Sequence, residues 1–201
     1  MSGAPLFTGA GRLIVISGPS GVGKDTVLER LFELEPRLRR SVSYTTRAPR
    51  EGERDGEPYT FVDETTFNEM VERGEFLEWA IVYGHLYGTS MQRVRDAVAR
   101  GEDIVLKIDV QGAARVRARV GDGAAFIFLL PPSREELRRR LYERASDDSS
   151  SLELRWANAV IELAEQDEYD AKVVNDDVDS AATAILSIIR DRAGTHRSRP
   201  L

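Results

Sequence analysis

Short apolar runs alternate with amphipathic segments along most of the chain. Residues 13–16 form a β-branched apolar run, and residues 26–34 then place Val27, Leu28 and Leu31 on one face of a helix. The pattern returns later, which predicts helices at 91–100, 111–120 and 180–190 and strands at 104–108, 126–130 and 172–174. Strands that alternate with helices in this way indicate a parallel sheet in an α/β fold.

Two segments and both ends of the chain depart from this alternation. Residues 41–88 are rich in turn and strand signals, which predicts an inserted antiparallel lobe. Pro131-Pro132-Ser133 opens a helix, and the polar stretch 145–151 leads into a second one, so we expect this helix pair to form a lid. Residues 1–11 and 193–201 are small and polar, and we expect them to be frayed tails.

Composition and charge exclude several classes of protein. The chain has 201 residues, of which 41% are hydrophobic, enough for one domain with a sizeable buried core. Its net charge of -6 comes from 28 basic and 34 acidic residues without long single-sign runs, which argues against a nucleic-acid partner. There is no cysteine for a disulfide or a thiolate metal site, and no apolar run approaches the roughly 20 residues of a membrane span. Since the N-terminus lacks the pattern of an export signal, we expect a cytoplasmic protein without a membrane anchor.

One motif carries clear chemistry. Gly18-Pro-Ser-Gly-Val-Gly23-Lys24 fits the first seven positions of the phosphate-loop pattern, between an expected strand and an expected helix. The glycines let backbone N–H groups turn toward a polyphosphate, and Lys24 can reach the β- and γ-phosphates. An ordinary glycine-rich turn is the alternative, but a chance match in this context is rare. The predicted ATP-binding residues are Gly18, Pro19, Ser20, Gly21, Val22, Gly23, Lys24, Asp25 and Thr26.

The position after the phosphate-loop lysine departs from the usual pattern. A Ser or Thr whose hydroxyl helps to hold Mg²⁺ normally stands there, but this chain has Asp25, followed by Thr26. Asp25 could hold the metal through water, Thr26 could substitute for the missing hydroxyl, or metal binding could be impaired. The sequence leaves these three alternatives open.

Two arginines stand three residues apart in Ser43-Tyr-Thr-Thr-Arg47-Ala-Pro-Arg50. Each guanidinium can give two parallel N–H bonds to a phosphate, and the proline restricts the backbone between them. A solvated basic turn explains this pair equally well when it is taken alone. The sequence downstream shifts the balance toward a binding site.

The order of motifs resembles the guanylate kinase family over roughly residues 12–190. The phosphate loop is followed by Ser-x-Thr-Thr-Arg-x-Pro-Arg at 43–50, Gly-Glu at 52–53 with Tyr59 downstream, Phe-x-Glu-Trp-Ala at 76–80, Tyr-Gly-Thr at 87–89, Asp-x-Gln-Gly at 109–112, Pro-Pro-Ser at 131–133 and Val-Asn-Asp-Asp at 174–177. The resemblance implies an α/β P-loop nucleoside monophosphate kinase, with a parallel sheet flanked by helices. It also implies a single domain over 1–201, with a core at 12–41, 90–130 and 159–192, an antiparallel GMP-binding lobe at 42–89 and a helical lid at 131–158.

The same resemblance implies transfer of the γ-phosphoryl group of MgATP to GMP, or to dGMP, by a monomer or a homodimer. Ser43 suits the O6 acceptor of guanine, and the Glu78 carboxylate can accept from both N1–H and the N2 amino group, whereas adenine presents the opposite pattern. Cross-strand packing is the alternative role for Tyr59 and Tyr87. The implied GMP-binding residues are Ser43, Arg47, Arg50, Tyr59, Glu78, Tyr87, Thr89 and Asp109, and the implied catalytic residues are Lys24, Arg47, Arg144 and Arg155.

Arginines of the expected lid complete the implied site. Arg144 and Arg155 stand at the positions of the family's two lid arginines, whose charge meets the transferred phosphoryl group. The alternative is that they lie on a helix surface, which is how we interpret the neighbouring Arg138, Arg139 and Arg140.

Lys107 stands where the family usually has an acid. We hypothesise that the changes at Lys107 and Asp25 occurred together and that the two side chains pair; the alternative is a lysine that faces solvent. Both changes also favour a rival function, a guanylate-kinase-like interaction module without catalysis. A P-loop kinase for another phosphorylated small molecule is a second rival, but it would have no reason to keep Ser43 together with Glu78.

Overall fold

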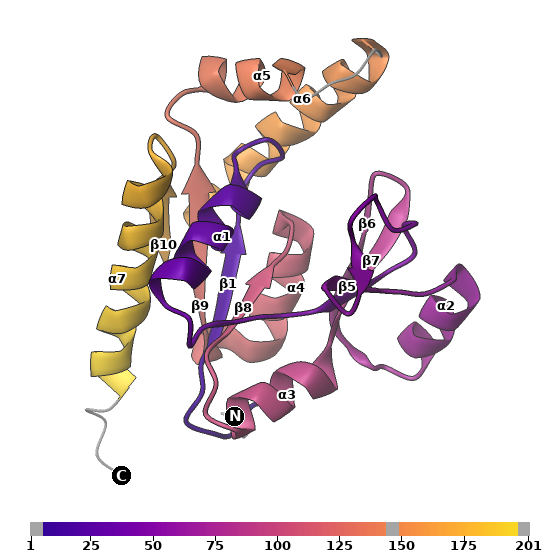
Figure 1. Cartoon of the computed structure of the whole chain (residues 1–201), viewed down its shortest axis with the longest axis vertical. Helices are drawn as coiled ribbons and strands as arrows, with labels where there is room; N and C mark the ends of the chain where they lie inside the picture. The colour runs from indigo at the N-terminus through magenta and orange to yellow at the C-terminus, as the bar shows by residue number, and fades with distance from the viewer. Residues whose placement is uncertain (1–5, 144–148, 197–201) are drawn as a thin grey trace. The chain divides into compact units, whose positions relative to one another are not determined.

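The computed structural model describes residues 6–143 and 149–196, and the chain falls into two compact units. The first unit comprises Leu38–Lys107 and Gln111–Ala124 together with the N-terminal segment up to Leu13. The second comprises Ile14–Arg37, Ile108–Val110 and the chain from Ala125 onward. Figure 1 shows the helices and strands of both units. The division into core, lobe and lid expected from the sequence stays a prediction.

The second unit contains the phosphate-loop motif in a layered α/β arrangement. Strands β10, β9 and β1 are neighbours in this order, and β10 runs parallel to β9. Helix α1 packs against α7, which also contacts β10 (Figure 1). The elements are β1 (Leu13–Ser17), α1 (Lys24–Leu34), β9 (Ala124–Leu130), α5 (Arg134–Glu143), α6 (Ser149–Ala164), the 3-10 helix η2 (Glu165–Glu168), β10 (Ala171–Val174) and α7 (Val178–His196). The expected α/β class, with a parallel sheet flanked by helices, is confirmed.

The first unit is built around a five-stranded mixed sheet in the order β4-β5-β3-β7-β6. The expected antiparallel pairing holds for β3 with β7 and for β6 with β7, whereas β5 runs parallel to both β3 and β4. Strand β2 runs parallel to β8. The elements are β2 (Arg39–Arg40), β3 (Ser43–Thr45), β4 (Arg54–Asp55), β5 (Pro58–Phe61), α2 (Glu64–Glu72), β6 (Phe76–Val82), β7 (His85–Ser90), α3 (Met91–Ala99), β8 (Ile104–Lys107), α4 (Val110–Val120) and the 3-10 helix η1 (Gly121–Gly123).

Helix α2 within this unit is absent from the sequence-based prediction. The Asp63 side chain caps its N-terminus by accepting a hydrogen bond from the backbone N–H of Thr66. Its buried residues Phe67 and Met70 form a small core with Phe76, whose ring stacks on that of Phe67 at 4.5 Å. The turn-rich composition around α2 concealed the three-residue spacing of the two apolar positions.

Residues 6–11 and 193–196, the described parts of the two expected tails, are more ordered than predicted. The backbone N–H of Gly11 donates to the Val98 carbonyl, and a Cβ on Gly11 would lie 2.2 Å from the Glu102 carbonyl oxygen, so only glycine fits this approach. At the other end, α7 continues to His196 instead of ending near residue 190. Near this end of α7, Arg190 contacts Glu35 and Arg192 contacts Asp170.

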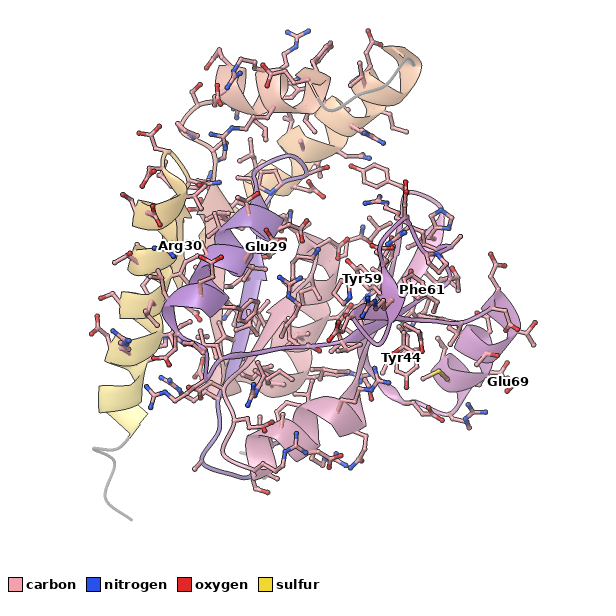
Figure 2. All side chains as sticks on the ribbon, in the orientation of Figure 1. Glu29, Arg30, Tyr44, Tyr59, Phe61 and Glu69 are labelled. Carbon is pink, nitrogen blue, oxygen red and sulfur yellow. The ribbon has the colours of Figure 1, made fainter. Side chains whose placement is uncertain are left out.

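The same ion pair predicts a pH dependence of stability. Hydrogen bonds from Arg37 and Arg190 lower the pKa of Glu35 to about 2, against an ordinary value of 4.5. We expect Glu35→Gln to lower the free energy of unfolding at pH 7 by about 1 kcal/mol or less, because both arginines are largely exposed and screened. The difference from the wild type should be present above pH 4.5 and vanish as the pH falls toward 2. Urea unfolding from pH 7 to pH 2.5 measures it, with Glu29→Gln, an exposed position on α1 (Figure 2), as the control.

None of the helices in the described ranges combines the length and apolar character that crossing a membrane requires.

Candidate active site

The phosphate-loop motif lies between β1 and α1, as predicted. Gly21 and Gly23 take left-handed backbone conformations, with φ of 83° and 95°, and the helix begins directly at Lys24. The Lys24 ammonium reaches back across the loop and donates to the carbonyl oxygens of Gly18 and Pro19 at 2.6 and 3.0 Å. A lysine held in this way can exchange the two carbonyls for phosphate oxygens without a change of backbone.

The phosphate loop is also held by residues that sequence reasoning missed. The Val22 carbonyl accepts from Asn175 Nδ2 at 2.8 Å and from Arg140 Nη1 at 3.3 Å. On the preceding turn, the Ser20 N–H donates to Glu162 Oε2 at 2.7 Å. Arg140 is therefore not the plain surface arginine that we expected, and its side chain is only 23% exposed. The Val-Asn-Asp-Asp motif was the one sequence signal that pointed to Asn175.

Glu162 places a carboxylate close to the phosphate loop. Burial raises its pKa most, and the negative charge of Asp109 raises it further, while the Ser20 N–H and the positive charge of Lys24 act in the opposite direction. The net shift is upward. A partly buried carboxylate with a backbone N–H donor therefore fixes one turn of the loop at some electrostatic cost.

The two candidate metal-binding residues occupy the first turn of α1. Asp25 and Thr26 are both exposed, directly after Lys24. Their carboxylate and hydroxyl oxygens are ligands of the type that Mg²⁺ prefers. Within the described ranges, no group of three or more acidic, histidine or cysteine side chains forms a metal site.

In the first unit, Arg47 lies at the centre of what we call the Arg47 cluster, made of Arg47, Glu53, Tyr59 and Tyr87. Its Nη2 donates to both carboxylate oxygens of Glu53 at 2.8 and 2.9 Å, and its Nε donates to the Tyr87 hydroxyl at 3.2 Å. The guanidinium carbon lies 5.6 Å from the centroid of the Tyr59 ring, which meets the Tyr87 ring edge-on. Figure 2 shows Tyr59 on β5 beside Phe61. The structure thus brings three of the implied GMP-binding residues together, namely Arg47, Tyr59 and Tyr87.

Glu53 organises the turn that carries both predicted arginines. Besides holding Arg47, its Oε2 accepts from the Arg50 backbone N–H at 2.7 Å. The Arg50 residue itself is exposed, so the turn presents one anchored and one exposed arginine. Sequence reasoning noted Glu53 only as part of a motif and gave it no role.

The predicted guanine-binding residues lie on neighbouring strands of the same sheet. Glu78 on β6 is in register with Thr89 on β7, and the Thr89 hydroxyl donates to Glu78 Oε1 at 2.5 Å. Glu78 is only 5% exposed, and Thr89 is fully buried. Ser43 is partly buried on β3, in register with Tyr59 on β5. A buried carboxylate is suited to a ligand with adjacent N–H donors.

Three other predicted residues stand apart from these groups. Asp109 belongs to the second unit, while the other implied GMP ligands belong to the first. Arg144 falls outside the described residues, and Arg155 is partly buried on α6. In the first unit, the Lys107 ammonium lies 5.8 Å from the centroid of the Tyr59 ring, so this lysine contacts the Arg47 cluster. Its pairing with Asp25 stays a prediction.

Comparisons with known proteins identify the family of this chain. The family model described as guanylate kinase matches residues 10–192. The chain is 48% identical over 179 residues to a guanylate kinase of Caldanaerobacter subterraneus subsp. tengcongensis, covering 89% of this chain and 86% of the relative. It is 46% identical over 180 residues to a guanylate kinase of Rubrobacter xylanophilus, covering 90% of this chain and 94% of the relative.

A solved structure gives the same result. The crystal structure of guanylate kinase from Anaplasma phagocytophilum superposes with a TM-score of 0.76 at 36% sequence identity, covering 91% of this chain and 86% of that one. The match of the family model over nearly the whole chain and identities above 40% to several relatives leave one assignment. The chain belongs to the guanylate kinase family, whose members are ATP:GMP phosphotransferases.

Proposed function

We propose that the phosphate loop binds MgATP and that the first unit binds GMP, with the phosphate on the Arg47 cluster and the guanine on Ser43, Glu78 and Thr89. An oxygen of the GMP phosphate attacks the γ-phosphorus of ATP. The new O–P bond forms as the bond from the γ-phosphorus to the β–γ bridging oxygen breaks, so GDP and ADP are the products. The transfer is direct and needs no covalent enzyme intermediate.

The buried Glu78–Thr89 pair is the observation that carries this proposal. It lies on β6 and β7, and β7 is also the strand that supplies Tyr87 to the Arg47 cluster. One sheet therefore offers a buried acceptor for a base and an arginine-centred cluster for a phosphate. Guanine presents two adjacent donors to such a carboxylate, whereas adenine presents an acceptor, N1, at the matching position, a mismatch that costs about 1 to 3 kcal/mol.

In the proposal, positively charged side chains stabilise the transferred phosphoryl group. Phosphoryl transfer is accelerated mainly by alignment and by cations that meet charge on the equatorial oxygens. In the proposal Lys24 holds the β- and γ-phosphates, and Arg155 approaches the γ-phosphoryl group from α6. Arg144 keeps the role that the family resemblance implies, and Asp109 is proposed to contact the guanine end of GMP.

Mg²⁺ enters the proposal with ATP as part of the substrate. Asp25, through a bridging water, or Thr26, through its hydroxyl, would hold the ion at the first turn of α1. When bound, the ion neutralises charge on the phosphates. The exposure of both side chains next to Lys24 is the observation that supports this role.

A coupled assay of ADP release tests the proposed function. MgATP is supplied with GMP, dGMP, AMP, CMP or UMP in turn. We expect rapid, Mg²⁺-dependent turnover with guanine nucleotides only. Binding of GMP without turnover would instead favour the interaction module that Asp25 and Lys107 suggest, and turnover with AMP would contradict the role given to Glu78.

The role of Glu78 predicts a loss of specificity in Glu78→Gln. A glutamine can accept from one guanine donor, but its amide N–H₂ then faces the other, so kcat/KM for GMP should fall by about 10- to 100-fold. The ratio of AMP to GMP turnover should rise, while the KM for ATP stays near the wild-type value. Glu69→Gln serves as the control, since Glu69 is exposed on α2 of the same unit (Figure 2). Unchanged discrimination between GMP and AMP would remove Glu78 from guanine recognition.

A further inference from the structure

We propose that Asn175, assisted by Arg140, is a positioning residue that orients the Val22–Gly23 peptide of the phosphate loop toward the phosphates of ATP. The inference rests on the proposed function of that loop. It assigns a role to the Val-Asn-Asp-Asp motif at 174–177, none of whose residues is proposed above to bind substrate.

Asn175 connects the sheet to the phosphate loop. The backbone N–H of Asn175, directly after β10, donates to the Leu130 carbonyl at the end of β9 at 2.7 Å. Its side-chain Nδ2 donates to the Val22 carbonyl at 2.8 Å, and the residue is only 3% exposed. Asn175 is therefore fixed to the sheet by its backbone and to the phosphate loop by its side chain.

Arg140 on α5 adds a second donor to the same carbonyl. Its Nη1 lies 3.3 Å from the Val22 oxygen, and both Nη atoms lie 3.3 to 3.4 Å from the Asn175 carbonyl oxygen. Its Nε donates to Glu136 Oε1 at 2.8 Å, so the guanidinium is held from its own helix. The residue after β10, helix α5 and the phosphate loop thus meet at the Val22–Gly23 peptide group.

Peptide geometry links this contact to nucleotide binding. In a planar trans peptide, the C=O and N–H groups point in opposite directions. Because Asn175 and Arg140 hold the Val22 oxygen on one side, the Gly23 N–H points to the other side. That N–H is among the backbone donors by which a phosphate loop at a helix N-terminus binds polyphosphate.

The approach of Asn175 also explains why residue 23 is a glycine. A Cβ on Gly23 would lie 2.7 Å from Asn175 Nδ2, and the φ of 95° is itself unfavourable for other residues. The side chain of Asn175 therefore occupies the space where a larger residue 23 would extend. This close packing restricts rotation of the Val22–Gly23 peptide.

Competitive inhibition against ATP tests the inference with two probes, ADP and tripolyphosphate, of which the second has no base or ribose. In Asn175→Ala we expect both inhibition constants to rise by about tenfold, the equivalent of one lost hydrogen bond, while the KM for GMP stays near the wild-type value. Arg140→Gln should shift both constants in the same direction by a smaller factor. The matched control is Arg139→Gln, because Arg139 precedes Arg140 on α5 but pairs with Glu136 and Glu143 on its exposed face.

The two probes separate the possible results. A loss for ADP without a loss for tripolyphosphate would place Asn175 on the nucleoside and overturn the inference, as would unchanged inhibition by both. If Asn175→Ala fails to fold, Arg140→Gln carries the same test, because this side chain is partly exposed. If neither tripolyphosphate nor ADP inhibits the wild-type enzyme, the proposed function of the loop fails instead.

Discussion

Replacement of Lys24 by methionine is expected to lower kcat by about 10²- to 10³-fold at saturating ATP and GMP. Methionine keeps much of the apolar stem but removes the positive charge that would meet the β- and γ-phosphates, an interaction that strengthens as charge develops in the transition state. In the absence of nucleotide, the variant also loses two hydrogen bonds to the Gly18 and Pro19 carbonyls. Initial rates with each substrate varied in turn separate the effect on kcat from that on KM.

A second lysine provides the control for this experiment. Lys172 on β10 is exposed and pairs with Asp167, so Lys172→Met removes an equal charge far from the phosphate-loop motif in sequence. It should retain the wild-type rate. Thermal unfolding of both variants checks that the fold is intact. A Lys24→Met rate within about threefold of the wild type would contradict the role given to Lys24.

The second large effect is expected for Arg47→Lys, in which kcat/KM for GMP should fall by about 10²-fold, equivalent to about 3 kcal/mol. Lysine keeps the charge but lacks the planar guanidinium that donates to Glu53, the Tyr87 hydroxyl and the Ala48 carbonyl, so it cannot keep these partners and donate to a phosphate in the same geometry. Most of the loss should appear in the KM for GMP, because Arg47 is proposed to bind the acceptor and not ATP. Steady-state kinetics with GMP varied at saturating ATP measure it.

Arg73→Lys is the matched control for Arg47→Lys. Arg73 follows α2 in the same unit and pairs with Glu69 and Glu75, but its side chain is 54% exposed. This variant should keep the wild-type KM for both substrates. An Arg47→Lys enzyme whose KM for ATP rises as much as its KM for GMP would contradict the assignment of Arg47 to the acceptor.

Short sequence motifs predicted those parts of the site whose residues lie close together in the chain. The phosphate loop is such a case, because its glycines, its lysine and the following helix act within one short segment. The strands and helices of the alternating pattern were also predicted, since apolar periodicity reports burial directly. Helix α2 was missed because its short apolar face lies among polar and turn-forming residues.

Contacts between distant segments explain what the sequence could not show. Asn175 and Arg140 lie 153 and 118 residues from Val22, and no local pattern predicts that they donate to the same carbonyl. Arg140 looked like one of three equivalent surface arginines until its helix was placed. In the same way, the tail beginning near residue 6 became ordered through the close approach of Gly11 to the end of α3.

The sequence alone determined the chemistry of this protein, because residue types and short spacings decide which groups can donate, accept or carry charge. It determined the phosphate loop, the paired arginines and the carboxylate that suits guanine. Only the tertiary structure decided how these groups are held. Glu53 fixes Arg47, Thr89 donates to a buried Glu78, and Asn175 fixes the phosphate loop. Such contacts depend on strand register and helix packing, which local sequence does not specify.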